Sequence, residues 1–333
     1  CIRDSTESPN DIRFEGPGVH GGSTVQGHLS ETRVTVLDPS GPSHDIQHLN
    51  QHIDYTALHT DAGADHAAID AQKAHSLATP LQPTISSDGE AIYIPAFGSS
   101  KIGVFTRSEL EDPAFEANFD PTAQSADYLS TMGGGPTGVA LDESNNRLYV
   151  ATRFNNAVET IDLATQTTTG VIALHNPDPS SIIDGRPFLY DAVATSGNGE
   201  GSCSSCHIFG DLDALAWNLG DPDGGVGTNN QPQPDPVLQF TNPTQPFHPM
   251  KGPMTTQTLR GMSTHGAMHW RGDRADGFFG LDPCTMPGYS QLNATEAPCD
   301  EDQAFRNFIV AFEGLVGKEG TITPAEMQLF SDF

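Results

Sequence analysis

The sequence predicts a chain of unlike parts, in which a strand-rich N-terminal region precedes a mainly helical C-terminal one. With 34 Gly and 25 Pro among 333 residues, turns must be frequent, which favours many short strands over long helices. Between residues 80 and 174, short apolar runs alternate with turn residues, as in a series of strands. Near the C-terminus the apolar spacing becomes helical, with offsets of 0, 3, 4, 7 and 10 at Phe305, Phe308, Ile309, Phe312 and Leu315.

Composition limits what the protein can bind. The sequence holds 15 Lys and Arg against 43 Asp and Glu, a net charge of −28. A field of that sign repels nucleic-acid phosphates and anionic lipid head groups, so we expect no nucleic-acid partner. No run approaches the roughly 18 apolar residues that a membrane-spanning helix needs, so we expect no transmembrane segment.

Residues 1–79 form a polar, histidine-rich region with at least one strand. The run RVTVL (33–37) alternates apolar and polar residues, and turn residues follow it at 38–41, which predicts a strand. A metal site is conceivable here, but the histidine spacings show no close pair followed by a third ligand. We therefore interpret the region as polar surface. Its histidines include His44, His48, His52, His59, His66 and His75.

Residues 80–195 contain an internal repeat. Two copies of a strand-turn-strand pattern place Tyr93 and Tyr149 in equivalent positions. Propeller blades usually recur every 40 to 50 residues. The two copies at Tyr93 and Tyr149 lie further apart than this, and a long loop around residues 108–135 would account for the difference. We predict β-propeller-like blades, with two unrelated hairpins as the alternative. The copies comprise residues 92–94, 98–100 and 102–105, and residues 148–150, 155–156 and 158–161.

The segment before residue 195 holds three or four blades, whereas a closed propeller needs at least four. Either the remaining blades come from elsewhere, or the chain is part of a longer one.

A Gly- and Ser-rich stretch (196–202) marks the predicted boundary to a third region, residues 196–333. A helix is predicted over 301–316, ended by Gly317. Thr323, Pro324 and Glu326 then occupy the N-cap, first-turn and capping-box positions of another helix. Because the chain stops soon after this start signal, we expect it to be a fragment or a truncated product.

Cys203 to His207 spell CSSCH. Two thiols at this spacing can each form a thioether with a vinyl group of one haem, and the following histidine then lies under the iron as its proximal ligand. About 0.003 such motifs are expected by chance at this composition and length. The alternative, a thioredoxin-like redox pair, needs the cysteines between a strand and a helix, and here a Gly-rich stretch precedes them. A zinc site would need a second close ligand pair, and Cys284 and Cys299 are separated by fourteen residues.

The motif also predicts a compartment, because haem is attached covalently outside the cytoplasm. We expect a periplasmic, outer-membrane-associated or extracellular protein. Cys284 and Cys299 could close their loop as a disulfide, contributing about 3 kcal/mol, with two buried thiols as the alternative. Cys1 could carry a bacterial lipid anchor, or could be an arbitrary fragment start.

The sixth iron ligand decides what such a haem can do, because a filled position favours electron transfer and an open one permits peroxide chemistry. We consider five methionines and histidines within residues 249–273 as candidates, and only one of them can coordinate the iron. Phe209 and Trp217 are expected to pack against the haem, and Arg260 and Arg271 could hold its propionates or form ordinary surface ion pairs. The five candidates are Met254, Met262, His265, Met268 and His269.

Three strings in this region, at 203–224, 254–274 and 308–317, resemble a bacterial family of secreted c-type cytochromes fused behind a YVTN-type β-propeller. The haem domain of that family is similar to the di-haem cytochrome c peroxidase group. The runs FGSSKIGVF (97–105) and RLYVATRFNNAVETID (147–162) resemble its last blades. The three strings are CSSCHIFGDLDALAWNLGDPDG, MTTQTLRGMSTHGAMHWRGDR and FIVAFEGLVG.

The resemblance implies a haem protein of the bacterial envelope, with the blades as scaffold or docking surface. It identifies 258–261 (TLRG) and 269–273 (HWRGD) as haem-lining, and we favour Met254 or His269 as the distal ligand. Family members often carry a second CxxCH, whereas this sequence holds one. That difference weakens the peroxidase interpretation, because the peroxidase group passes electrons between two haems.

Three functions follow from these observations. The first is an electron-transfer cytochrome with one covalent haem c and redox proteins as partners. The second is a peroxidase-like or oxidase-like haem enzyme. The third is an interaction protein, in which the blades bind a partner or the chains form a homo-oligomeric, electron-conducting assembly. We rank electron transfer first.

Overall fold

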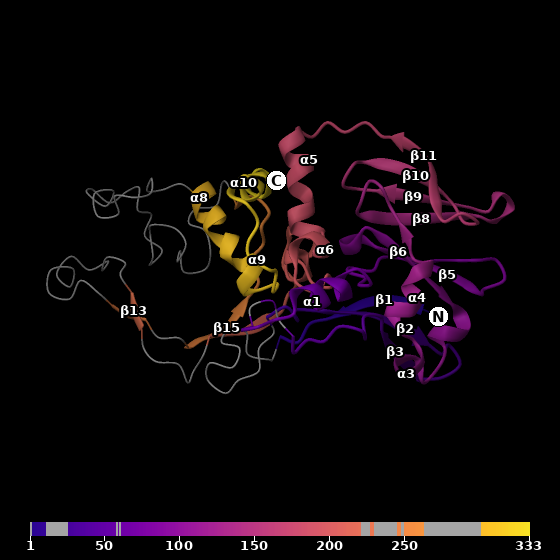
Figure 1. Cartoon of the computed structure of the whole chain (residues 1–333), viewed down its shortest axis with the longest axis horizontal. Helices are drawn as coiled ribbons and strands as arrows, with labels where there is room; N and C mark the ends of the chain where they lie inside the picture. Colours follow the sequence, from indigo (N-terminus) through magenta and orange to yellow (C-terminus); the bar gives the residue numbers. More distant parts are fainter. Residues whose placement is uncertain are drawn as a thin grey trace. The chain divides into compact units, whose positions relative to one another are not determined.

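The computed structural model describes residues 2–10, 26–57, 59, 61–220, 227–229, 245–247, 250–262 and 301–333 (Figure 1). The chain divides into two compact units, each built from segments that are distant in sequence. In the described part of the chain, no helix has both the length and the apolar content needed to cross a bilayer. Unit 1 comprises Cys1–Pro9, Gly27–Ser205 and Phe312–Phe333, and unit 2 comprises Asn10–Gln26 and Cys206–Ala311.

The N-terminal part of unit 1 is a three-stranded antiparallel sheet in the order β1-β2-β3. The strand predicted over 33–37 lies within β2, where Val34 is fully buried. Leu49, just beyond β3, is also fully buried and joins the same core cluster. Residues 1–79 therefore contribute to the core, and their interpretation as polar surface is incomplete. The strands are β1 (Ile2–Glu7), β2 (Glu31–Leu37) and β3 (His44–His48).

Two four-stranded antiparallel sheets follow, and in each the spatial order of the strands is the chain order. The two predicted strand-turn-strand copies are the hairpins β5-β6 and β9-β10. Ile102 and Leu129 of the first sheet pack against Leu148, Val150 and Ile161 of the second in one buried cluster. The sheets are β4 (Thr84–Ile85), β5 (Ala91–Ala96), β6 (Lys101–Thr106) and β7 (Leu129–Ser130), then β8 (Pro136–Asp142), β9 (Arg147–Thr152), β10 (Ala157–Asp162) and β11 (Thr167–Ala173).

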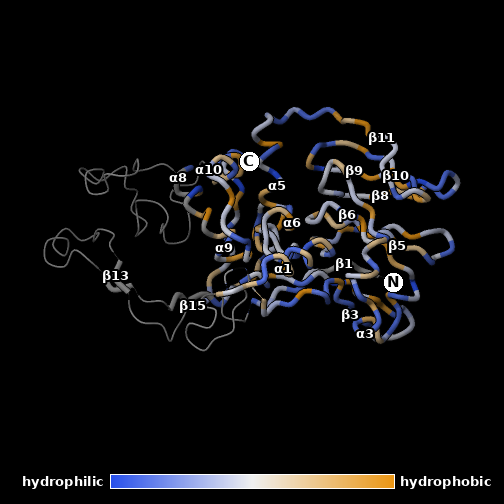
Figure 2. The backbone as a smooth tube through the Cα atoms, viewed as in Figure 1, coloured by the Kyte–Doolittle hydropathy of each residue, from blue (hydrophilic) through white to orange (hydrophobic). Residues whose placement is uncertain are grey.

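The equivalent hairpins share a turn geometry. Ser100 (φ 54°) and Asn156 (φ 54°) both adopt the left-handed conformation just before the second strand of their hairpin. Asn146 (φ 53°), between β8 and β9, does the same. Asn enters this region at low cost, which explains why short polar turns suffice to reverse the chain. In Figure 2, short hydrophobic stretches alternate with hydrophilic ones, as strands with one buried face require.

The long loop predicted between the repeats is an ordered insertion of short helices between β6 and β7. Phe115, Phe119 and Leu110 are buried and share a core cluster with Phe105 and Tyr128. The insertion therefore caps one side of the first sheet. Its elements are α2 (Arg107–Leu110), α3 (Phe115–Asn118), α4 (Pro121–Gln124) and the 3-10 turn η2 (Ser125–Asp127), and a further 3-10 turn, η1 (Phe97–Ser99), lies between β5 and β6.

The helices of unit 1 follow local capping signals. The predicted capping box at Thr323 is confirmed, because Thr323 accepts from the Glu326 backbone N–H and the Glu326 side chain accepts from Thr323 in return. The helix it starts, α10, packs against α5, and Phe330 contacts Phe188 and Phe312. The helices are α1 (His66–Lys73), α5 (Ser180–Tyr190), α6 (Ala192–Thr195) and α10 (Pro324–Asp332), with the 3-10 turns η3 (Glu143–Asn145) and η4 (Cys203–Ser205).

The single helix predicted over 301–316 is wrong in detail, because it is divided into three pieces. An apolar stripe at offsets of three and four identifies the buried side but not the type of backbone hydrogen bond, and a 3-10 turn also places i and i+3 on one side. Gly317, with φ +68°, ends the run as predicted. The pieces are α8 (Glu301–Arg306), the 3-10 turn η9 (Asn307–Val310) and α9 (Ala311–Gly314).

The described residues of unit 2 include two antiparallel strand pairs as well as helical turns. The prediction of a mainly helical region beyond residue 196 is therefore incomplete. These strands pair with partners far along the chain, which local periodicity does not detect. The elements are η5 (Ile208–Gly210), β12 (Ala216–Gly220) with β15 (Met250–Thr255), and β13 (Gly227–Asn229) with β14 (Gln245–Phe247).

The packing of α5 on α10 requires glycine at position 185. A Cβ added there would overlap the backbone carbonyl of Leu329. We expect Gly185→Ala to lower the free energy of unfolding by about 1–3 kcal/mol. The matched control is Gly314→Ala, where an added Cβ meets nothing within 4 Å. Urea denaturation of both variants checks this, and equal stability of the two would contradict it.

Candidate functional site

The Ser/Gly segment, residues 196–202, leads into the CSSCH motif through the interior of unit 1. Its composition predicts a boundary or linker, yet the exposed fraction is 1% at Ser196, Glu200 and Ser202. The backbone N–H of Gly197 donates to the carbonyl of Val316 (2.9 Å). The motif therefore follows a segment that is buried and hydrogen-bonded. Its small side chains allow its backbone to pack closely against the rest of unit 1.

Glu200 is the centre of a buried polar network. Its Oε1 accepts from the Thr32 backbone N–H (2.7 Å) and from Asn50 Nδ2 (2.7 Å), and lies 3.2 Å from His48 Nε2. Its Oε2 accepts from the Tyr55 hydroxyl. Burial, and the charge of Glu200, raise the pKa of Tyr55 far above its usual value, so the phenol stays protonated and donates. A buried carboxylate needs such donors to offset its desolvation.

Asn198 and the serines fix the rest of the Ser/Gly segment. Asn198 donates to the carbonyl of Gly27 (2.7 Å), and Ser76 donates to the carbonyl of Asn198 (2.6 Å). The Ser205 hydroxyl accepts from the Ser202 backbone N–H (3.0 Å). These bonds close the turn η4, which carries Cys203, so the first cysteine of the motif starts from a fixed backbone.

The pKa of the Cys203 thiol bears on the thioredoxin-like alternative. A redox-active CxxC pair needs a lowered thiol pKa to supply its thiolate. Burial instead raises the pKa of Cys203 to about 12. At neutral pH this sulfur is therefore a thiol, which disfavours the thioredoxin-like alternative.

His207 is oriented by a backbone carbonyl within unit 2. Its Nδ1 lies 2.8 Å from the carbonyl oxygen of Gln257, just beyond β15. A carbonyl only accepts, so Nδ1 carries the proton and Nε2 carries the lone pair that a metal binds. Metal-ligating histidines almost always have their other ring N–H held in this way. The Gln257 carbonyl thus fixes the tautomer of His207, and its role as an iron ligand stays a prediction.

Arg260 clamps the loop that follows the motif. Its guanidinium donates to the carbonyl of Phe209 (Nη2, 2.9 Å) and pairs with Asp211 (3.2 Å). The Leu259 backbone N–H donates to the carbonyl of Gly210 (2.9 Å). These bonds, together with the hydrogen bond between His207 and Gln257, join the loop around η5 to the loop that follows β15. The structure thus places Arg260 in this clamp, and its predicted contact with a propionate stays a prediction.

Two further predicted residues face each other on the β12-β15 ladder, where Trp217 is paired in register with Met254. Trp217 is buried and its Nε1 donates to Asp213 (2.8 Å). Phe209 is half exposed and adopts a left-handed conformation (φ 51°). The roles assigned to these side chains stay predictions. The remaining predictions concern residues outside the described part of the chain. These residues are Cys1, His265, Met268, His269, Arg271, Cys284 and Cys299.

Sequence reasoning missed Glu200 and Gln257, which orient the two halves of the motif region. A lone acidic residue within a Gly/Ser-rich stretch is a weak signal of burial. Gln257 acts through its backbone, so its side-chain type gives no signal at all.

No protein-family model and no curated protein matches the chain. Among solved structures, it is similar to Kuenenia stuttgartiensis hydrazine synthase, at 15% identity and a TM-score of 0.31 over 48% of this chain and 41% of that one. It is also similar to a Bacteroides fragilis structure provisionally named a 6-phosphogluconolactonase, at 13% identity and a TM-score of 0.28 over 44% and 38%. The chain thus spans less than half of either protein, and similarity at these TM-scores supports no inference about fold or function.

The Glu200 network makes a stability prediction. Glu200→Gln keeps the size of the side chain but replaces one of its two acceptor oxygens with an NH2 group, which must then face either the donors of Thr32 and Asn50 or the hydroxyl of Tyr55. We expect the free energy of unfolding to fall by about 2–3 kcal/mol. The exposed Glu90, replaced by Gln, serves as the control and should change it by less than about 0.5 kcal/mol. Urea titrations of both variants decide this, and an unchanged midpoint for Glu200→Gln would refute it.

His52 makes a pH prediction. Its Nε2 is 2.9 Å from the Gln72 carbonyl and its Nδ1 is buried without a hydrogen-bond partner, and burial lowers its pKa from 6.5 to about 4. Because the unfolded chain binds the proton more tightly, the stability from neutral His52 is present above about pH 6.5 and lost as the pH falls toward 4. The loss should reach about 2–3 kcal/mol.

Urea denaturation between pH 7.5 and 4 tests this prediction. His52→Gln should have a flatter pH profile than the wild type, and the exposed His44→Gln should not. Parallel profiles for the wild type and His52→Gln would contradict the assignment.

Proposed function

We propose that this chain is an extracytoplasmic c-type cytochrome that carries one covalent haem and transfers single electrons. The observation that carries the proposal is the CSSCH motif with the Nδ1 of its histidine held by the Gln257 carbonyl. That bond leaves Nε2 as the metal-binding atom. The residues present therefore fit a haem iron.

Cys203 and Cys206 would hold the haem covalently. Each sulfur forms one bond to a vinyl carbon, and its thiol proton passes to the neighbouring carbon, so no oxidant or reductant is consumed. The thiol form of Cys203 supplies this proton. The hydrogen-bonded turn η4 holds this first attachment point at a fixed place in unit 1.

The chain's own groups then set the properties of the site. When bound, the haem would supply a metal centre that gains and loses one electron. The Gln257 carbonyl fixes the ring plane and tautomer of His207 and makes its Nε2 a better donor, which favours the oxidised state. We assign the distal ligand to Met254 or His269.

We assign the two four-stranded sheets to β-propeller blades that serve as scaffold or docking surface. Their chain-order antiparallel strands and shared turn geometry support this. The net charge of −28 favours a redox partner with a basic docking face. Association of chains could extend electron transfer over a larger assembly.

Haem attachment is tested by replacing the two cysteines. Protein made with a cytochrome c maturation system should keep its haem through denaturing electrophoresis. The Cys203→Ala/Cys206→Ala variant should lose it, because only thioethers survive denaturation. Ser204→Ala, within the same motif, is the matched control and should keep it. Retention by the double variant would contradict covalent attachment at this motif.

Electron transfer is tested on the holoprotein by spectroelectrochemistry. We expect a low-spin spectrum, a reversible one-electron couple and no change on adding cyanide or peroxide, because a protein ligand fills the sixth position. Met254→Ala or His269→Ala, whichever removes that ligand, should give a high-spin spectrum. A high-spin wild type that turns over peroxide would overturn electron transfer in favour of a peroxidase-like enzyme.

A further inference from the structure

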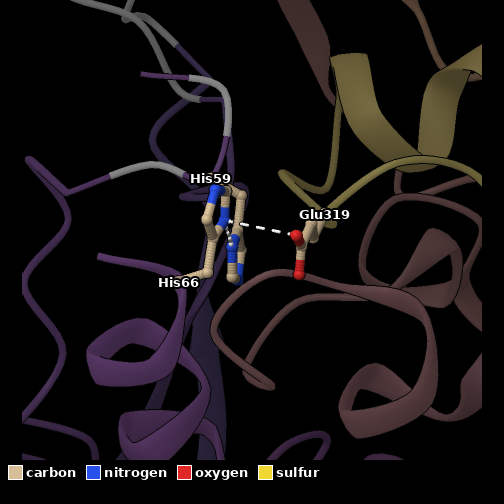
Figure 3. Close-up of side chains that lie close together, drawn as sticks. All are labelled: His59, His66 and Glu319. Carbon is tan, nitrogen blue, oxygen red and sulfur yellow. Dashed lines mark hydrogen bonds and ion pairs between the residues drawn. The ribbon is translucent and has the colours of Figure 1, made fainter. Parts of the chain in front are cut away.

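We infer that His59, His66 and Glu319 form a binding site for a divalent transition-metal ion in unit 1 (Figure 3). The ligand atoms of the three side chains all lie within 4.8 Å of one another. Nδ1 of His59 is 2.8 Å from Nδ1 of His66, which is 3.6 Å from Oε1 of Glu319. The site is separate from the CSSCH motif and from the residues assigned to haem binding.

The distances suit a four-coordinate ion. Metal–nitrogen and metal–oxygen bonds of about 2.0–2.2 Å in a tetrahedral arrangement place neighbouring donors about 3.4 Å apart. The His59–His66 separation is slightly shorter than this and the His66–Glu319 separation slightly longer. Small side-chain movements would therefore admit the ion. Three protein donors leave a fourth position for solvent or another ligand.

The two imidazoles are held in place for this role. Their rings are stacked, with centroids 5.1 Å apart and planes 12° from parallel. Two facing Nδ1 atoms can share one proton, but they repel if both rings are protonated. A cation that accepts both lone pairs removes that conflict.

His59 supplies an independent observation. Its side chain is 1% exposed, and its Nε2 is buried without a hydrogen-bond partner. The nearest carboxylate oxygen in an ion pair with it, Asp70 Oδ1, is 3.6 Å away, and Asp70 is itself paired with Lys73 (3.0 Å). If Nδ1 binds a metal, Nε2 must carry the proton, and that proton faces Asp70. At 3.6 Å this contact is an ion-pair distance, and a small movement of Asp70 would complete the carboxylate–histidine–metal arrangement that orients ligands in known sites.

The site would tie together remote parts of unit 1. His59 lies in the loop before α1, His66 is the first residue of that helix, and Glu319 follows α9 in a turn bounded by Gly317 and Gly320. A bound ion would therefore fasten the C-terminal segment of unit 1 to its N-terminal region.

The same place adjoins the Ser/Gly segment. A Cβ added at Gly197 would overlap the carbonyl of Gly317 and lie 3.3 Å from Cδ2 of His59. The ring of His59 thus packs beside the backbone that leads toward Cys203.

Two imidazoles and one carboxylate select the class of ion. Nitrogen donors suit Zn²⁺, Cu²⁺ and Ni²⁺, whereas Ca²⁺ and Mg²⁺ prefer all-oxygen sites. We assign Zn²⁺ as the representative ligand, because it accepts three protein donors with one open position.

Isothermal titration calorimetry with Zn²⁺ tests the site on the full-length haem-loaded protein, after treatment with a chelator and desalting. We expect one Zn²⁺ per chain, together with a higher melting temperature. His66→Ala and Glu319→Gln should each weaken binding by at least about tenfold, and Asp70→Asn by about tenfold through the orientation of His59. His175→Ala, at an exposed histidine, is the control and should bind like the wild type.

The outcomes separate this site from the haem. Circular dichroism of each variant confirms that it is folded, and the haem spectrum should be the same in all of them. Absence of Zn²⁺ binding, equal affinity in the wild type and the His66→Ala and Asp70→Asn variants, or equally tight Ca²⁺ binding would overturn the assignment. A wild type that lacks haem but binds Zn²⁺ would leave this site intact and refute only the proposed function.

Discussion

Burial of the Glu200 carboxylate is the constraint on which the arrangement of unit 1 depends. A buried carboxyl group needs hydrogen-bond donors, and Glu200 accepts from the backbone of β2, from Asn50 just after β3 and from Tyr55. Glu159 follows the same principle: fully buried in β10, it accepts the backbone N–H groups of Met132 and Gly133. In both places a buried carboxylate fixes a glycine-containing stretch, which Glu200 does from within the stretch and Glu159 does by accepting from the backbone of Met132 and Gly133.

This constraint has a chemical consequence at the motif. The Ser/Gly segment looks like a linker by composition, but its hydrogen bonds bring Cys203 to a fixed turn. In unit 2, the separate bond between His207 and the Gln257 carbonyl determines which ring nitrogen can meet a metal. Under the proposed function, an attachment residue that is already held in an ordered turn would lose less conformational entropy when the haem binds. The bonds of the turn at Cys203 and the bond of His207 to Gln257 involve different parts of the chain. One set holds the start of the CSSCH motif and the other holds its end.

Features coded by neighbouring residues could be predicted from the sequence. The β2 strand follows from the alternation in RVTVL, the two hairpins from repeated turn residues, and the start of α10 from Thr323 and Glu326. Features that join remote residues could not be predicted. Glu200 depends on donors more than a hundred positions away, and Glu319 lies near His59 and His66, which are more than two hundred positions away in the sequence. Helix pieces within 301–316 were indistinguishable from one helix, because both keep the same apolar stripe. The CSSCH motif is a local signal, so haem attachment could be predicted from the sequence and stays a prediction, whereas the hydrogen bonds around the motif could not be predicted.

The central claim is that one haem is bound covalently at Cys203 and Cys206. The most direct test is to measure the mass of the denatured chain by mass spectrometry and to record the alkaline pyridine haemochrome spectrum of the same sample. Haem tethered at Cys203 and Cys206 predicts a mass equal to the polypeptide plus one haem, and an absorption band at the position given by two thioether links. A mass equal to that of the bare polypeptide, without a haemochrome band, would contradict it.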